Sequence, residues 1–525
     1  MKVLITDPIT EKGLRILSDS KIEVVYLPNS TLEEKNIAAE SANAWIIRSG
    51  TKITSELIRK AKNLSVIGRA GVGIDNIDIN EATRRGVVVM NTPDGNTIAA
   101  AEHTIAMMLA LSRNIHSGHN SLEKGEWNRH QLVGTELQNK ILGVVGLGKI
   151  GISVQKRCLS FGMKIIGSDP YVSQNQFDKD ELEVTDLETL VKTADFITVH
   201  VPLTQDTRGL FDYSMLTKMK KNARIINVAR GGIIDENDLC RALKENKISG
   251  AAIDVFESEP INLNHPLVGL PNALLTPHLG ASTLEAKEGV STAICTQIRD
   301  YLTNERFINV VNMRLSDLVK LKEFKPHHDL SRLLGQIQFQ LGDGPIDDVQ
   351  IKCFGAIDES RTLSMAFLKG LLEKRVPERI NYINAEVIAK ELKINLQVSF
   401  SNLETNYTNL ISTTVISGGK EMQLDGSVFD KGQSRLVSIN GFDLEVKPQG
   451  TMLLIKNIDV PGVIGRVGTF LGTQNINIGA YILSRRGENN NAFSVVSVDS
   501  ELSKDQLKTL SAIDNIESVK QVIIN

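Results

Sequence analysis

The chain has 525 residues, which is too many for a single hydrophobic core, so its length predicts three or four domains. Its 41% hydrophobic and 23% charged residues are typical of a soluble globular protein. The 59 basic and 62 acidic side chains give a net charge of −3, with no long basic stripe along the chain. We therefore expect neither a nucleic-acid partner nor a membrane surface.

The cysteines, the apolar runs and the first residues indicate a cellular setting. Four cysteines lie far apart and match neither a metal site nor a disulfide framework: Cys158, Cys240, Cys295 and Cys353. No apolar run reaches the roughly 18 residues of a membrane span. The opening residues MKVLITDPIT read as a strand and a turn, without the apolar region of a signal peptide. These features predict no metal and a reducing, cytoplasmic setting.

Short apolar runs alternate with helix-like stretches at the start of the chain. The predicted strands are Val3–Thr6, Glu23–Tyr26, Ala44–Ile47, Ser65–Ile67 and Val87–Met90. This alternation predicts a parallel α/β sheet. The next segment, Asn96 to Ile115, carries alanines and methionines at helical spacing, which predicts a helix packed against other helices.

A second α/β alternation begins at Lys140. Six apolar runs each end in Gly, Asp, Pro, Arg or His: KILGVVGLG, MKIIGSDP, DFITVHVPL, ARIINVAR, GAAIDVF and ALLTPHLG. Open parallel sheets bind ligands at the carboxyl ends of their strands, so we expect these endings to form the rim of a site. A helix from about Thr283 to Thr303 should return the chain to the first sheet.

The remainder of the chain has a different character. Residues 315–447 are helical at first and then rich in alternating β-branched residues, which predicts an α+β domain. From Gly450 the predicted order is βαββαβ, which is typical of a small ferredoxin-like module. The predicted fold class is therefore α/β, with two doubly wound parallel-sheet (Rossmann-like) lobes followed by these two smaller domains.

The glycines after the first strand of the second sheet match a dinucleotide-binding fingerprint. Gly146, Gly148 and Gly151 follow the apolar run Ile141–Val145, and Asp169 lies 18 residues beyond Gly151, at the end of the next strand. The glycines allow a tight turn, close approach of a pyrophosphate and close helix–strand packing. The helix N-terminus favours the anion. The carboxylate of Asp169 would accept the ribose hydroxyls and repel a 2′-phosphate, which favours NAD over NADP.

Charged residues gather at the later strand ends. Arg230 follows one apolar strand, Asp254, Glu257 and Glu259 follow the next, and His278 follows the last. Oxidation of a secondary alcohol needs a base for the hydroxyl proton and a cation for a neighbouring carboxylate. A carboxylate beside the histidine would fix its tautomer and raise its basicity. The spacing therefore indicates an alcohol-oxidising site.

Several long motifs resemble the D-isomer-specific 2-hydroxyacid dehydrogenase family. They are GRAGVGIDNID, NTPDGNTIAAAEHTIAMML, GLGKIG, NVARGGIIDENDL, GAAIDVFESEP and TPHLGAST. The match covers essentially the whole chain, and DVPGVIGRVGTFLGTQNINI near its end resembles an ACT module. The resemblance implies a substrate-binding lobe at 1–97 and 285–312, an NAD-binding Rossmann domain at 98–284, an intervening domain at 315–447 and an ACT domain at 450–525.

The resemblance also implies roles for individual residues. The family's catalytic arginine, glutamate and histidine fall on Arg230, Glu259 and His278, and Glu257 is set aside because the family's glutamate directly precedes the proline. Asp254 matches an acid that contacts the nicotinamide carboxamide. The implied cofactor-binding residues are Gly146, Gly148, Lys149, Ile150, Gly151, Asp169, His200, Val201, Pro202, Val228, Ala229, Arg230, Asp254, His278, Gly280 and Ala281.

A phosphorylated substrate needs cations outside the nucleotide fold. The resemblance implies substrate-binding arginines at Arg48 and Arg69, and at Arg129, which in relatives can reach the neighbouring subunit's site. The implied helpers are Ser49, Gly50 and Asn96. The glycine-rich stretch GRAGVGIDN, from Gly68, lacks an acid at the fingerprint distance, so we expect it to line the opposite wall of a cleft.

The C-terminal module suggests regulation. ACT modules that this segment resembles pair edge to edge and bind a free amino acid at the interface. The implied effector is L-serine, with Asp459 for its ammonium group, Asn477 across the seam and Asn457 where some relatives carry a histidine. Such a module can also be merely structural.

The resemblance implies a homo-oligomer, dimer or tetramer, that oxidises 3-phospho-D-glycerate to 3-phosphohydroxypyruvate with NAD, the first step of phosphorylated serine biosynthesis. A related reductase of glyoxylate or hydroxypyruvate is the alternative within enzymes. A sensor that uses an NAD-binding dehydrogenase fold for regulation, and an amino-acid-binding protein with a vestigial enzyme, are alternatives from other classes.

Overall fold

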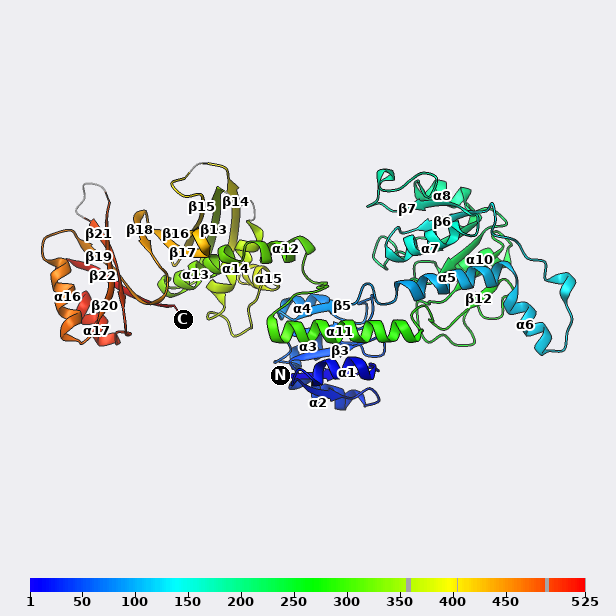
Figure 1. The fold of residues 1–525 in the computed structure, drawn as a ribbon, viewed down its shortest axis with the longest axis horizontal. Coiled ribbons are helices and arrows are strands. Elements are labelled where there is room, and N and C mark those ends of the chain that lie inside the picture. The colour runs from blue at the N-terminus through cyan, green and yellow to red at the C-terminus, as the bar shows by residue number, and fades with distance from the viewer. Residues whose placement is uncertain (356–359, 404, 487–490, 525) are drawn as a thin grey trace.

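The computed structural model describes residues 1–525 except 356–359, 404, 487–490 and 525. Figure 1 shows an elongated molecule in which the N-terminal sheet lies between two larger parts. The second parallel sheet lies on one side of it, and the two C-terminal sheets lie on the other. We call the N-terminal sheet with its helices the first lobe and the second parallel sheet with its helices the second lobe.

The first lobe is a five-stranded parallel sheet in the order β2-β1-β3-β4-β5. Its strands are β1 (Lys2–Ile5), β2 (Glu23–Tyr26), β3 (Ala44–Ile47), β4 (Val66–Arg69) and β5 (Val88–Asn91). Its helices are α1 (Glu11–Ser18), α2 (Leu32–Glu40), α3 (Ser55–Lys60), α4 (Ile79–Arg84) and the returning α11 (Leu284–Asn304). All four residues of β3 are buried, as expected of a strand covered on both faces.

A glycine explains why α11 returns to this sheet. A Cβ atom on Gly68 of β4 would lie 2.8 Å from Cγ1 of Ile294 in α11. The bare glycine therefore lets α11 pack directly on the strand. Ile294 and Ile298 are fully buried there, so a helix from late in the chain completes the core of the first sheet.

The second lobe is a seven-stranded parallel sheet in the order β12-β11-β10-β9-β6-β7-β8. Its strands are β6 (Ile141–Val145), β7 (Lys164–Ser168), β8 (Glu183–Val184), β9 (Phe196–Val199), β10 (Arg224–Asn227), β11 (Gly250–Ile253) and β12 (Ala273–Leu275). The six predicted strands are confirmed. The additional edge strand, β8, has only two residues and no apolar run that would have predicted it.

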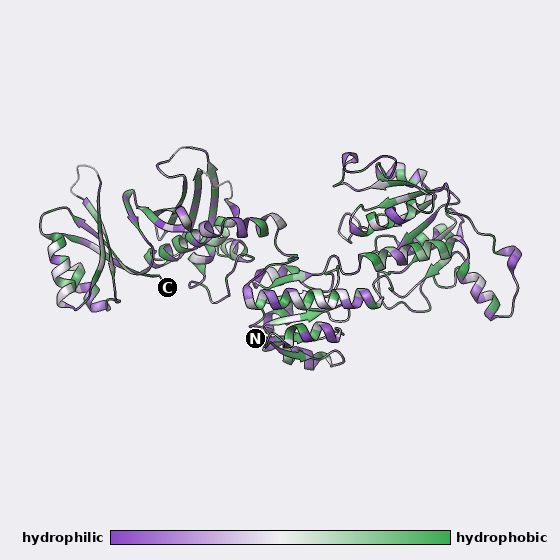
Figure 2. Cartoon of the chain, in the orientation of Figure 1, coloured by the Kyte–Doolittle hydropathy of each residue, from purple (hydrophilic) through white to green (hydrophobic). Residues whose placement is uncertain are grey.

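The second lobe's helices cover both faces of its sheet (Figure 1). They are α5 (Thr97–Ser112), α6 (Ile115–Glu123), α7 (Lys149–Leu159), α8 (Leu187–Thr193), α9 (Tyr213–Thr217) and α10 (Glu236–Lys244), with the short η1 (Arg129–Gln131) and η2 (Gln174–Gln176). Helix α6 and the segment after it project away from the lobe (Figure 1). In Figure 2 the strands of both parallel sheets are mainly hydrophobic, as buried parallel strands should be.

The intervening part is a six-stranded mixed sheet in the order β14-β13-β15-β16-β17-β18. Its strands are β13 (Ile346–Gly355), β14 (Asn395–Ser401), β15 (Asn409–Ser417), β16 (Lys420–Phe429), β17 (Gln433–Ile439) and β18 (Phe442–Val446). Its helices are α12 (Leu315–Glu323), α13 (Lys325–Leu341), α14 (Arg361–Leu372) and α15 (Ala385–Glu391), with the short η3 (Asp430–Gly432). A Cβ on Gly370 would lie 2.0 Å from the carbonyl oxygen of Arg332, so α13 and α14 approach at backbone distance.

The C-terminal part has the predicted βαββαβ order and an antiparallel sheet in the order β20-β21-β19-β22. Its elements are β19 (Gly450–Ile458), α16 (Val463–Thr473), β20 (Ile478–Arg485), β21 (Asn491–Val498), α17 (Lys504–Ser511) and β22 (Ile516–Ile524). It shares a hydrophobic core with the intervening part: the rings of Phe442 and Phe493 stack with centroids 5.6 Å apart. The predicted fold class is confirmed throughout.

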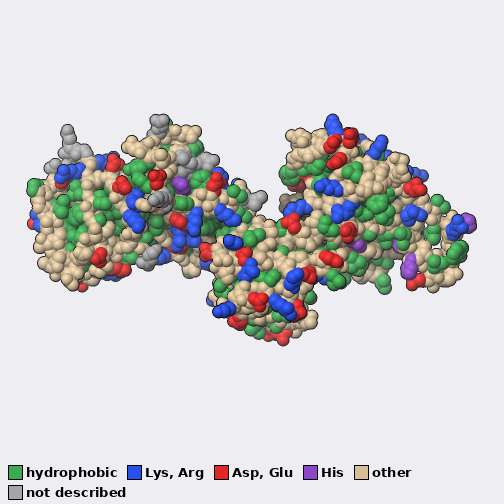
Figure 3. All heavy atoms as spheres, viewed as in Figure 1, with side chains coloured by type: hydrophobic (Ala, Val, Ile, Leu, Met, Phe, Trp, Pro, Cys, Tyr) green, Lys and Arg blue, Asp and Glu red, His purple; other side chains and the backbone are tan. Residues whose placement is uncertain are grey.

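No helix in the described part of the chain is long and apolar enough to cross a membrane. Within the same residues, no three His, Cys, Asp or Glu side chains are grouped as a metal ion would require. All four cysteines are buried and none forms a disulfide with another, and burial raises the pKa of the Cys158 and Cys295 thiols to about 12. Figure 3 shows basic and acidic side chains interspersed over the visible face.

Candidate active site

The nucleotide fingerprint forms the turn between β6 and α7. Gly146 has φ +94°, a conformation that favours glycine, and a Cβ on it would lie 2.7 Å from the carbonyl oxygen of His200. A Cβ on Gly151 would lie 2.1 Å from the carbonyl oxygen of Gly146. These two glycines are therefore required by the fold of the turn itself.

Gly148 differs from them because nothing in the described protein lies within 4 Å of where its Cβ would be. It is the residue that precedes α7, so open space lies directly in front of that helix's N-terminus. Asp169 follows β7, and its carboxylate accepts the backbone N–H of Leu147 in the glycine turn (2.9 Å) and that of Tyr171 (2.9 Å). A glycine turn with room at its centre and a carboxylate at its side fits an adenine dinucleotide.

His200 directly follows β9 (Phe196–Val199), and its carbonyl lies beside this turn. Its Nε2 lies 2.9 Å from the hydroxyl of Thr198. Burial lowers the pKa of His200 to about 4, so its ring is neutral near neutral pH. Of the neighbouring predicted residues, Val228 is buried and Pro202 accepts a hydrogen bond from Thr207 through its carbonyl oxygen (2.6 Å). Lys149 is exposed and pairs with Asp94.

His278 and Glu259 form a hydrogen-bonded pair at the rim of the second sheet. Nδ1 of His278 lies 2.7 Å from Oε2 of Glu259, and Oε1 of Glu259 accepts the backbone N–H of Phe256 (2.9 Å). Burial raises the pKa of Glu259. The hydrogen bonds from His278 and Phe256 lower this pKa by more than burial raises it, so the net shift is downward. An ionised Glu259 makes Nδ1 the donor and leaves Nε2 of His278 available for proton transfer.

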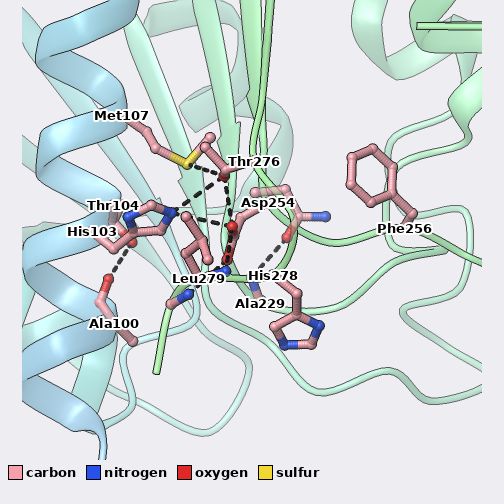
Figure 4. Close-up of polar contacts among 12 residues, drawn as sticks. Ala100, His103, Thr104, Met107, Ala229, Asp254, Phe256, Thr276, His278 and Leu279 are labelled. Carbon is pink, nitrogen blue, oxygen red and sulfur yellow. Dashed lines mark hydrogen bonds and ion pairs between the residues drawn. The ribbon is translucent and has the colours of Figure 1, made fainter. Parts of the chain in front are cut away.

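Asp254 holds the loop that carries His278 (Figure 4). His278 has φ +54°, which is uncommon outside glycine, and its backbone N–H donates to the Asp254 carbonyl (2.9 Å). The buried Asp254 carboxylate accepts the N–H groups of Leu279 (2.7 Å) and Gly280 (2.9 Å). These three bonds over-determine the unusual backbone and fix the imidazole at the rim.

The sequence did not point to His103, which completes this network. His103 is on α5, and its Nε2 lies 3.2 Å from Oδ1 of Asp254 and 3.3 Å from the hydroxyl of Thr276 (Figure 4). The Thr276 hydroxyl donates to the same carboxylate oxygen (2.6 Å). Among the described residues Oδ2 accepts only the Gly280 N–H, which leaves it capacity for a cofactor amide.

The two lobes enclose a cleft of about 570 Å³. Its walls include Arg48, Arg69, Asn96, Arg230, Glu259 and His278, together with Ser49 and Ala281. The loop from Arg69 to Asn76 forms part of the first lobe's wall, as the sequence predicted for this glycine-rich stretch. Gly50 lies beside Asp7, whose carboxylate accepts the Arg48 backbone N–H (2.5 Å).

Arg69 lines this cleft and is half-buried, with its Nε atom fully buried. Its Nε has no hydrogen-bond partner among the described residues, and the same is true of Oδ1 of Asn96. Burial and, next, the positive charge of Arg230 lower the pKa of Arg69 to about 10, so it remains charged near neutral pH. A half-buried cation whose buried donor is unsatisfied is suited to an anionic ligand.

Other predicted site residues lie far from the cleft lining. Arg129 is exposed in η1, on the projecting segment after α6. In the C-terminal part, Asn457 is 1% exposed, Asp459 pairs with Arg485 (2.7 Å), and Asn477 donates to Asp499 (2.8 Å). The structure does not bring these residues to the cleft, and their roles remain predictions.

A two-lobed α/β fold with a dinucleotide turn and a basic cleft defines a nicotinamide-dependent dehydrogenase. The family model "D-isomer specific 2-hydroxyacid dehydrogenase, NAD binding domain" matches residues 105–280, and "D-3-phosphoglycerate dehydrogenase intervening domain" matches residues 323–440. The chain is 42% identical over 522 residues to the D-3-phosphoglycerate dehydrogenase of Methanocaldococcus jannaschii, covering 99% of each chain. It is 37% identical over 524 residues to the Bacillus subtilis enzyme of that name, again covering 99% of each.

Solved structures resemble the two lobes. A Thermus thermophilus protein is 33% identical with a TM-score of 0.55, over 59% of this chain and all of that one. A Staphylococcus aureus NAD-dependent formate dehydrogenase in complex with NAD is 30% identical with a TM-score of 0.54, over 59% of this chain and 99% of that one. The full-length matches show that the chain belongs to the D-3-phosphoglycerate dehydrogenase family.

Proposed function

We propose that the chain oxidises 3-phospho-D-glycerate to 3-phosphohydroxypyruvate with NAD⁺, the step that opens phosphorylated serine biosynthesis. One observation carries the proposal: the His278–Glu259 pair and three arginines, Arg48, Arg69 and Arg230, line the same cleft between the lobes. The substrate is a secondary alcohol that carries a carboxylate and a phosphate. A base and several cations in one cleft match those three groups.

In the proposed reaction the C2–H bond and the O–H bond of the substrate alcohol both break. The glycine turn and Asp169 would hold NAD⁺, which would supply the acceptor for the hydride that leaves C2. His278 takes the hydroxyl proton at Nε2, while Glu259 stabilises the resulting imidazolium through Nδ1. Arg230, whose guanidinium reaches the cleft from the end of β10, holds the substrate carboxylate.

The first lobe supplies the phosphate site. Arg48 and Arg69 both follow or end first-lobe strands, and the unsatisfied Nε of Arg69 is available to a phosphate oxygen. An unphosphorylated acid such as glyoxylate or hydroxypyruvate would leave the buried Nε of Arg69 unsatisfied, which costs binding free energy. The cleft therefore favours the phosphorylated substrate over the alternative reductase activity.

Exposed apolar side chains on the projecting segment bear on the oligomeric state. We propose a homo-oligomer because the projecting segment exposes Ile115, Leu122, Trp127 and Val133, of which Val133 is 81% exposed. A second copy that covers them would also bring Arg129 toward the partner's cleft. Four buried cysteines that form no disulfide are consistent with a reducing, cytoplasmic setting.

The division of labour among the domains is also proposed. We assign substrate binding to 1–97 with 285–312, NAD binding to 98–284, and L-serine binding to an ACT domain at 450–525 joined through the intervening domain at 315–447. Serine would have to compete with Arg485 for Asp459. Inhibition by serine, measured beside D-serine and glycine as controls, tests that assignment.

The direct test is NADH consumption with 3-phosphohydroxypyruvate, run beside hydroxypyruvate and glyoxylate, for the wild type and His278→Ala. We expect turnover of the phosphorylated substrate alone to be efficient, and a fall in kcat of about 10²- to 10⁴-fold in the variant. NADH affinity, measured by fluorescence, should not change. Equal rates on all three acids would instead support the general reductase.

A further inference from the structure

Asp75 joins the two lobes across the cleft. It lies in the loop after β4 of the first lobe, whereas Arg230 follows β10 of the second. Nε of Arg230 donates to Oδ2 of Asp75 at 3.1 Å, and both residues line the cleft. The Arg230 side chain is 29% exposed and that of Asp75 is 59% exposed, so this ion pair is partly shielded from solvent.

A second hydrogen bond fixes the orientation of the Arg230 guanidinium. Nη1 donates to the carbonyl oxygen of Ala229 at 2.6 Å. Nη2 lies against the backbone of Gly73, where a Cβ would be only 1.9 Å away. Because a guanidinium is planar, contacts at Nε and Nη1 determine its rotation and leave Nη2 for a ligand in the cleft.

The charge of Asp75 also matters to the cleft as a whole. Arg48, Arg69 and Arg230 line one cavity, and like charges in a shielded site repel each other. The positive charge of Arg230 lowers the pKa of Arg69, whereas Asp75 opposes that shift. A carboxylate at this position reduces the repulsion that three arginines would otherwise impose on the empty cleft.

We propose that Asp75 is a positioning residue: it orients the Arg230 guanidinium across the cleft so that Nη2 faces the substrate carboxylate. The inference rests on the proposed function, because it assigns Arg230 to that carboxylate. It makes a first-lobe residue part of the support for a second-lobe catalytic group. Approach of the lobes would then assemble the binding site for the substrate.

The test is a double-mutant comparison on kcat/KM for 3-phosphohydroxypyruvate, measured by single-turnover NADH consumption at high enzyme concentration. Asp75→Ala should lower kcat/KM about 10- to 100-fold, because small misplacements of a substrate-orienting group have effects of that size. Asp75→Asn should lose less, because its amide oxygen still accepts from Nε. Asp75→Ala placed on Arg230→Ala should cause no further loss, because Asp75 acts through that arginine.

Gly73→Ala tests the orientation of the Arg230 guanidinium at Nη2, a different nitrogen from the Nε that contacts Asp75. The added methyl group would displace Nη2, so we expect a loss similar to that of Asp75→Ala with unchanged NADH affinity. The control is Asp78→Asn, three residues away in the same segment: Asp78 caps α4 by accepting the Glu81 N–H (3.0 Å), and asparagine caps equally well. It removes a negative charge without touching Arg230, and its kinetics should match the wild type.

The kinetic results distinguish failure of the proposed activity from failure of the proposed role of Asp75. No turnover by the wild type would overturn the proposed function itself. Normal wild-type turnover with Asp75→Ala within twofold of it, or an equal further loss when Asp75→Ala is added to Arg230→Ala, would overturn the positioning role. If Asp75→Ala unfolds, as judged by its Tm, Asp75→Asn carries the same double-mutant comparison.

Discussion

Each lobe has a glycine-rich loop, and the two loops use glycine for different purposes. In the turn from Gly146 to Gly151, the central Gly148 leaves space that no described protein atom fills. In the loop after β4, Cβ atoms on Gly71 and Gly73 would lie 1.8 Å and 1.9 Å from the guanidinium nitrogens of Arg69 and Arg230. The first loop leaves room for a ligand, whereas the second leaves room for the protein's own cations.

This difference teaches that a glycine pattern gains meaning from its neighbours. The second-lobe turn precedes helix α7 and has Asp169 beside it, so the open space at Gly148 suits a dinucleotide. The first-lobe loop has the guanidinium groups of Arg69 and Arg230 beside it, so its glycines serve the binding of a charged substrate. Substitutions in the two loops should therefore separate cofactor binding from substrate binding.

The largest effect on activity should come from substituting alanine for one glycine in each loop. Gly71 has φ +151°, and Gly71→Ala would push the Arg69 guanidinium out of place, so we expect kcat/KM for 3-phosphohydroxypyruvate to fall about 10- to 100-fold. NADH affinity should be unchanged. Gly151→Ala, in which the methyl group meets a backbone carbonyl, should instead weaken NADH binding and lower the Tm. Steady-state kinetics and NADH fluorescence on both variants check this; equal losses of both ligands in both variants would abolish the distinction.

A smaller effect is expected at the acid beside the second-lobe turn. Asp169→Ala removes the carboxylate that would repel a 2′-phosphate, so the preference for NADH over NADPH should narrow by about 10-fold. The comparison requires kcat/KM for both cofactors with the same substrate. Lys149→Ala serves as the matched control, because its exposed ammonium pairs with Asp94 and its loss should leave the ratio of the two cofactors largely unchanged. If the wild type shows no preference for NADH over NADPH, Asp169 does not select the cofactor.

The smallest effect concerns the pH dependence of stability. The hydrogen bonds from His278 and Phe256 lower the pKa of Glu259 in the folded state, so they stabilise the fold above the ordinary carboxyl pKa, and this contribution is lost as the pH falls through the lowered value. Glu259→Gln should therefore have a lower Tm than the wild type at pH 7, and the gap should close below about pH 4. A gap that widens on acidification would mean that the shift has the opposite sign.

The parts of the fold that sequence predicts well are those encoded locally. Continuous apolar runs such as Ile141–Val145 identified the buried parallel strands, because such strands are covered on both faces. The two-residue β8 has no such run and escaped prediction. The fingerprint glycines and Asp169 were found because their spacing itself encodes the turn.

The parts that escaped prediction depend on distant contacts. Asp75 meets Arg230 across 155 positions of sequence, and His103 meets Asp254 across 151. Neither residue belongs to a local pattern, since a carboxylate in a loop and a histidine on an apolar helix are both common surface or core features. Only the folding of α5 and of the first lobe against the second sheet brings them to the site.

The most direct test of the central claim, that the first lobe's arginines select a phosphorylated substrate for chemistry on the second lobe, is Arg69→Ala assayed with 3-phosphohydroxypyruvate and with hydroxypyruvate. Loss of a charge-assisted hydrogen bond predicts a fall of about 10- to 100-fold in kcat/KM for the phosphorylated acid. The rate with hydroxypyruvate should change little, because that acid places no group at Arg69. Equal losses on both acids would contradict the account, since Arg69 would then support the cleft as a whole and not recognise the phosphate.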